Sequence, residues 1–187
     1  IKGKRGYCTK KDNGKAPYRL IAVENYYGLG AIIDISIQMR AFEKAVSKNM
    51  IPWLKECKLV RRNVRIGSSI IVYLFKCLKE RLYLGVKSAV LRKNSYASYT
   101  DCKSLRGRRH LRELVNLSRQ GEKCAIVFIA AIPAMEAFIP NKDVDKVYYE
   151  LTKKAVDIGV VVKATALYFN LINNNIYMYD SDLMVKL

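Results

Sequence analysis

The residues best suited to chemistry lie in one short, strongly basic segment. From residue 106 to residue 112 the sequence reads Arg-Gly-Arg-Arg-His-Leu-Arg, which places Arg106, Arg108, Arg109, His110 and Arg112 at the start of a predicted helix. Helix N-termini present backbone N–H groups and the positive end of the helix dipole, and arginine side chains pair with phosphate oxygens. The segment therefore predicts a phosphate-binding site; a solvated basic helix end is the alternative.

Hydrolytic chemistry has weaker support in the sequence. Metal-dependent cleavage of a phosphodiester needs carboxylates that hold a divalent cation, and in a helix–strand–strand–strand–helix core they would come from the second and third strands. Those strands contain Lys87 and no carboxylate, and Asp101 is the one acidic residue between positions 81 and 112. One carboxylate makes a poor magnesium site, and His110 is the only histidine available to a nucleophilic triad. We expect no metal, no cofactor and no catalytic residue.

The positive charge of the chain is regional. The formal net charge is +18, and residues 51–123 contain 18 basic but only five acidic residues. Two further basic groups accompany the helix start: Arg61 and Arg62 on a predicted strand, and Lys10 and Lys11 in a polar N-terminal segment. No pattern of side chains aimed at base edges is evident. The distribution predicts a DNA-binding protein that contacts mainly phosphates and has low sequence specificity.

Several other classes are disfavoured. No apolar run reaches the roughly 18 residues that a membrane span needs, and no signal-peptide pattern follows Ile1, so we expect a cytoplasmic protein, or a fragment of one, with no membrane partner. The five cysteines have no metal-like spacing and predict reduced thiols. Binding to RNA or to an acidic membrane surface stays open, because both respond to the same positive charge.

Hydrophobic periodicity predicts the elements that must position these residues. We expect strands at 20–24, 31–37, 58–66, 69–75, 81–91, 123–132, 160–169 and 176–179. We expect helices at 39–50, 104–120 and 143–158. The run at 69–75 is nearly continuously apolar, which is typical of a strand buried on both faces. The order predicts an α/β (α+β) fold with a mixed central sheet flanked by helices.

Several motifs together resemble the bacterial sugar fermentation stimulation protein family. They include Val86-Lys87-Ser88, Asp101, the segment 106–114 and Phe138-Ile139-Pro140-Asn141. The resemblance implies a DNA-binding protein linked to regulation of sugar (maltose) catabolism. It also implies a partial OB-type β-barrel at residues 1–38 and a restriction-endonuclease-like domain, similar to PD-(D/E)xK nucleases, at residues 39–187.

The chain departs from the family pattern where a nuclease would bind metal. Val72 stands at a usually acidic position, the usual Glu-Val-Lys begins with Gly85, and Leu105 replaces the acid before Arg-Gly-Arg. Lys87 and Asp101 are retained. These positions predict a vestigial nuclease site in a protein that binds DNA without cleaving it. A metal-dependent nuclease that relies on Lys87 and Asp101 is the alternative.

Overall fold

The computed structural model describes residues 3–11, 14–67, 69–78 and 80–187. Within these residues a nine-stranded sheet has the order β1-β2-β3-β11-β9-β6-β5-β4, with β12 paired to β11. Its strands are β1 (Gly6–Lys10), β2 (Tyr18–Tyr26), β3 (Leu29–Ile32), β4 (Cys57–Ile66), β5 (Ser69–Cys77), β6 (Glu80–Ser88), β9 (Lys123–Ala130), β11 (Val161–Asn170) and β12 (Asn175–Asp180). A smaller sheet contains β7 (Leu91–Lys93), β8 (Tyr96–Tyr99), β10 (Ala137–Pro140) and β13 (Met184–Val185).

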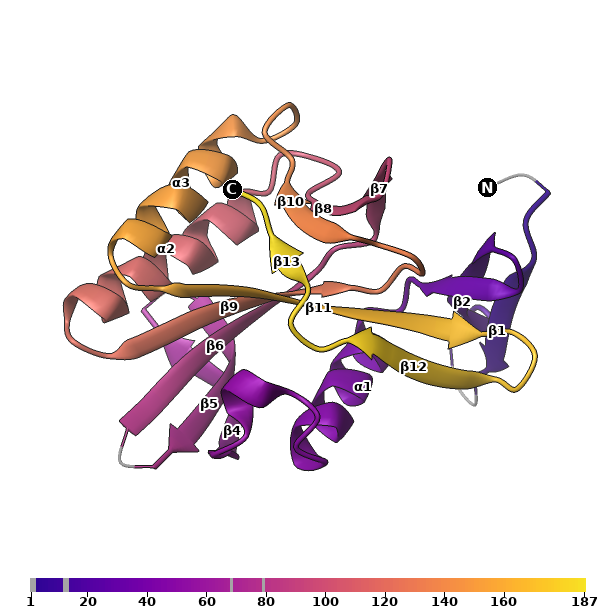
Figure 1. Ribbon diagram of the computed structural model, residues 1–187. Helices are drawn as coiled ribbons and strands as arrows, with labels where there is room; N and C mark the ends of the chain where they lie inside the picture. Colours follow the sequence, from indigo (N-terminus) through magenta and orange to yellow (C-terminus); the bar gives the residue numbers. More distant parts are fainter. Residues whose placement is uncertain (1–2, 12–13, 68, 79) are drawn as a thin grey trace.

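Helices cover both faces of the large sheet. Figure 1 shows α2 (Leu105–Arg119) and α3 (Lys146–Asp157) on one face, together with the small sheet, and α1 (Ile35–Ser47) on the other. A 3-10 turn, η1 (Pro52–Leu54), follows α1. Strands β6, β9 and β11 are parallel, whereas β4 and β5 are antiparallel to their neighbours. The predicted mixed sheet flanked by helices is confirmed. None of the helices in the described ranges is long and apolar enough to cross a membrane.

Side-chain caps fix where the helices begin. The N-cap oxygens of Asp34, Ser104 and Asp145 accept hydrogen bonds from backbone amides in the first turns of α1, α2 and α3. The strand predicted at 31–37 is therefore wrong in its second half. Strand β3 ends at Ile32, and Asp34 begins a helix instead of lying inside a strand.

The core has two parts, one on each side of the sheet. Helices α2 and α3 pack over a cluster that includes Leu111 and Phe128, and α1 packs over a cluster that includes Phe42 and Tyr73. Strand β9 lies between them, and its residues are buried from the second onward. Burial on both faces was predicted for the run at 69–75 as well, but β5 alternates and leaves Ile70 44% exposed.

The first three strands are joined to the rest of the large sheet. Strand β3 pairs with β11 at Gly30–Phe169 and at Leu29–Asn170. The division at residue 38 and the partial barrel stay predictions.

The expectation of reduced cysteines is wrong for Cys57 and Cys77, which lie directly opposite each other on β4 and β5 and form a disulfide. Cross-strand register of this kind is set by the fold and is not visible in cysteine spacing.

Candidate nucleic-acid interface

The basic segment forms the first turns of α2, as predicted. Gly107 donates its N–H to the Ser104 hydroxyl at 3.1 Å, which caps the helix. The helix is amphipathic, so burial of its apolar side against the sheet turns Arg106, Arg109 and Arg112 toward solvent. No ion pair involves these three arginines within the described ranges.

Lys87 extends from strand β6 of the sheet toward the first turns of α2. Its ammonium lies 3.2 Å from His110 Nδ1. The pKa of Lys87 is lowered to about 8, mainly by burial and to a smaller extent by the charge of Arg106. The pKa of His110 is lowered to about 4, mainly by burial and to a smaller extent by the charges of Lys87, Arg106 and Arg109. At neutral pH the imidazole is therefore neutral, and its Nδ1 can accept a hydrogen bond from the largely protonated lysine.

We call Lys87, Arg106 and Arg109, together with the neutral His110 beside them, the α2 cation cluster. Every electrostatic neighbour that shifts the pKa of Lys87 or His110 is a cation, and burial acts in the same direction. Concentrated positive charge is costly in a half-buried site, and a bound anion would relieve that cost. Sequence reasoning identified all four residues, but the contact between strand and helix depends on the fold.

Arg108 has a different role from its neighbours. Its guanidinium bonds the buried carboxylate of Asp145, with Nε 3.0 Å from Oδ1 and a second nitrogen 2.8 Å from the same oxygen. Asp145 also accepts the backbone N–H groups of Ser104 and Tyr148. Burial opposes ionisation of Asp145, but these hydrogen bonds outweigh it and lower its pKa. Arg108 therefore fastens α2 to α3, and we leave it out of the phosphate-contacting set.

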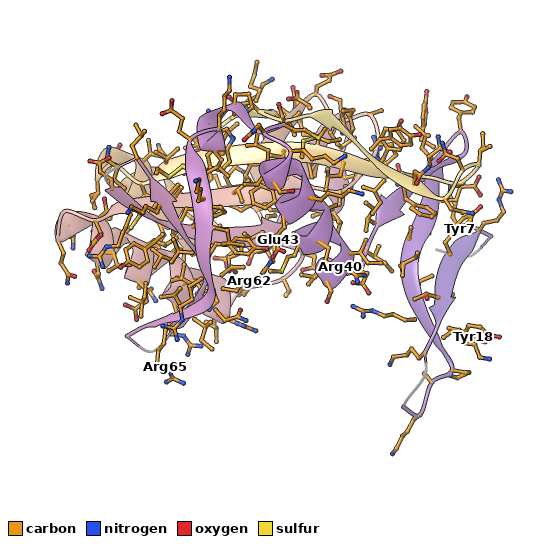
Figure 2. The ribbon with its side chains drawn as sticks, turned by 90° about the horizontal axis from the view of Figure 1, so that it is seen from below. Tyr7, Tyr18, Arg40, Glu43, Arg62 and Arg65 are labelled. Carbon is orange, nitrogen blue, oxygen red and sulfur yellow. A yellow bond between two sulfur atoms is a disulfide. The ribbon has the colours of Figure 1, made fainter. Side chains whose placement is uncertain are left out.

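The other two predicted basic groups lie away from this surface. Arg62 pairs with Glu43 of α1 at 2.7 Å, on the opposite face of the sheet, as Figure 2 shows. Arg61 is exposed on the same strand, β4, at one end of the strand order. Lys10 and Lys11 are exposed at β1, which is the other end. The predicted DNA-binding set therefore does not form one continuous surface.

The positions of the predicted vestigial nuclease site do not all lie on one face of the sheet. Gly85 faces α2, because a Cβ added there would lie 3.1 Å from Leu114 Cδ1. Val72 packs against the core on the α1 side, away from the face that carries Lys87 and His110. Asp101 is exposed in the turn before α2, and Leu105 is exposed in the first turn.

Comparison with known proteins decides the family. A family model described as "Sugar fermentation stimulation protein RE domain" matches residues 36–172. The chain belongs to the sugar fermentation stimulation protein family. The homolog from Pyrococcus furiosus is 43% identical over 177 residues, which cover 95% of this chain and 76% of that protein. The homolog from Archaeoglobus fulgidus is 39% identical over 185 residues, which cover 99% of this chain and 78% of that protein.

A solved structure of the same family has the same fold. The structure of Pyrococcus furiosus SfsA in complex with Ca²⁺ matches with a TM-score of 0.94 and 41% sequence identity. The match covers 100% of this chain and 80% of that chain. The chain thus spans about four fifths of this family member, and the family resemblance inferred from the motifs is confirmed.

Proposed function

We propose that this protein binds DNA in the cytoplasm through the α2 cation cluster, mainly by contacts to phosphates. One observation carries the proposal: Lys87 and His110 lie 3.2 Å apart, and Arg106 lowers the pKa of both. Such a site gains most from a dense anion, and the phosphates of duplex DNA supply regularly spaced negative charges. Because the sequence shows no pattern of base-reading side chains, we expect low sequence specificity.

The helix geometry supports phosphate as the anion. Arg106, Arg109 and Arg112 follow one flank of α2 at intervals of three residues, so their side chains can reach successive phosphates along a backbone. Lys87 is half-buried beside this row, next to the first turns of the helix. There the positive end of the helix dipole adds to the side-chain charges.

A salt series with a fluorescein-labelled random duplex tests the proposal by anisotropy. We expect the wild-type protein to give a log–log slope of about −4 or steeper, because several phosphates are neutralised. Replacing Arg106 and Arg109 together by Gln should reduce the slope by about two. Arg119→Gln with Lys154→Gln, which removes two exposed charges from the last turns of α2 and α3, is the matched control. A slope left unchanged by the double replacement would remove the α2 cation cluster from the binding surface.

We also propose that the protein does not act as a metal-dependent nuclease. The Ca²⁺ of the Pyrococcus furiosus structure is the observation that favours such an activity. The residues of this chain do not fit a divalent cation: the described ranges contain no group of three or more His, Cys, Asp or Glu that could hold one. The face of β6 that meets α2 carries Gly85 and Lys87 in place of a carboxylate.

Incubation of supercoiled plasmid with the purified protein and Mg²⁺ or Mn²⁺ tests this second proposal. We expect the plasmid to stay supercoiled. Nicked product that disappears in Asp101→Asn would instead establish the nuclease, with Asp101 as a metal ligand.

Regulation of sugar (maltose) catabolism is the cellular role that we propose from the family. Transcript levels of maltose genes in a strain without the protein would test it.

A further inference from the structure

We infer that a groove on the α1 face binds an anionic amphiphile, a molecule with an apolar tail and a carboxylate or phosphate head. The groove lies between α1 and strands β2, β3, β11 and β12, and it has a volume of about 570 Å³. That volume is within the range of roughly 300–1,000 Å³ that is typical of small-molecule sites. This inference is independent of DNA binding, because the α2 cation cluster lies on the other face of the sheet.

The floor of the groove is apolar and is made by both the helix and the sheet. Ile37, Ala41 and Ala45 repeat every four residues, so they form one stripe along α1. Phe169 of β11 and Met178 of β12 line the groove from the sheet. The two alanines are small, which leaves space between the helix and the strands. A slender hydrocarbon chain would bury apolar surface here that water now contacts.

A row of cations borders this apolar stripe. Arg40 and Lys44 directly precede the two alanines of the stripe, and Lys48 follows the second alanine by about one helical turn. All three cations line the groove and are exposed. Residues four apart on a helix are separated by about 6 Å along its axis, so the row extends over about 12 Å. Figure 2 shows Arg40 on α1 between Glu43 and the β1–β2 hairpin.

The two acids that α1 and its N-cap contribute are already engaged. Glu43 accepts hydrogen bonds from Arg62 and from the Tyr73 hydroxyl. Asp34 caps α1 and pairs with Arg19. Across the described part of the chain, no ion pair involves any of the three cations of the row.

Charge complementarity therefore calls for an anionic head, and the apolar floor calls for a hydrocarbon tail. An inorganic anion would leave the floor in contact with water, and a neutral hydrocarbon would leave the cations without a partner. A long side chain such as lysine can also turn its charged end to the rim while its methylene groups extend the apolar wall. The groove thus matches both ends of an amphiphile.

Titration with the fluorescent fatty acid cis-parinaric acid tests the inference. We expect saturable binding, and displacement by laurate or by dodecyl phosphate; the relative strength of the two competitors identifies the preferred head group. Dodecanol, which has the same tail without a charge, should compete at least tenfold less well, because a charge-assisted hydrogen bond is worth about one factor of ten or more.

Two variants separate the tail site from the head site. Ala41→Trp should fill the groove and abolish saturable binding. The exposed triple replacement Arg40→Gln, Lys44→Gln, Lys48→Gln should fold normally and weaken binding about tenfold. The triple replacement Arg119→Gln, Lys153→Gln, Lys154→Gln removes the same three charges at exposed positions outside the groove and should bind like the wild type. Absence of saturable binding, equal competition by dodecanol, or full affinity in the triple variant would each overturn the inference.

Discussion

The two faces of the large sheet both carry excess positive charge, but the surroundings of that charge differ. On the α2 face Asp145 engages Arg108, and the remaining cations gather around a half-buried lysine at a helix start. On the α1 face Glu43 engages Arg62, and the remaining cations border an apolar groove. Net charge alone would assign both faces to the same partner. The neighbouring groups are polar on one face and apolar on the other, and for this reason we propose a different partner for each face.

The largest effect that we expect comes from breaking the carboxylate–arginine pair on the α2 face. Asp145 is 1% exposed at its side chain, and its loss would leave Arg108 and two backbone amides without their acceptor. Asp145→Ala should lower the free energy of unfolding by about 3 kcal/mol, as measured by urea denaturation at pH 7. Asp143→Ala, which removes an exposed carboxylate nearby, should change little.

The same pair has a defined pH dependence. Because the folded-state pKa of Asp145 is lowered, its contribution is fully present above the pKa of an unfolded aspartate and is lost as the pH falls through the folded value. The difference between the wild type and Asp145→Ala should therefore shrink under acidic conditions. A difference that stays constant down to low pH would show that packing, and not charge, gives Asp145 its role.

An intermediate effect should appear in the pH dependence of DNA binding. Lys87 has a pKa of about 8, lowered by burial and then by Arg106, and a bound phosphate would favour its protonated form. DNA affinity should therefore decrease by roughly tenfold as the pH rises from 7 to 9.5, measured by anisotropy at constant salt. Lys87→Met should bind more weakly and lose this dependence. An equal decrease in Lys87→Met would assign the titration to another group.

The smallest effect should come from the corresponding pair on the α1 face. Arg62 is 58% exposed, so solvent screens its bond to Glu43 much more than in the buried pair. We expect Glu43→Gln to lower the free energy of unfolding by less than about 1 kcal/mol. Glutamine keeps an oxygen that can accept from Arg62 and from Tyr73. A loss as large as that of Asp145→Ala would remove the distinction between the two faces.

The sequence predicted best what depends on local pattern. The three helices, most strands of the large sheet and the basic start of α2 follow from periodicity, capping and charge, and the structure contains them. The short strands of the small sheet were missed because they have two to four residues and no strong periodicity. The Asp34 cap was misassigned because apolar, β-branched residues lie on both sides of it.

Contacts between distant residues could not be predicted from the sequence. Arg108 and Asp145 are 37 positions apart, and Lys87 and His110 are 23 apart, so only the fold shows which cations are engaged and which remain available. The spacing of Arg40, Lys44 and Lys48 was visible in the sequence. The groove beside them was not, because β11 and β12 supply its far wall.

The most direct test of the central claim compares the two faces in one DNA-binding experiment. The salt dependence of binding to a random duplex would be measured for the wild type, for Arg106→Gln with Arg109→Gln, and for Arg40→Gln with Lys44→Gln. We expect the α2-face double variant to lose about two units of log–log slope and the α1-face double variant, which loses the same charge, to lose much less. Equal losses would show that net charge, and not the α2 cation cluster, determines DNA binding.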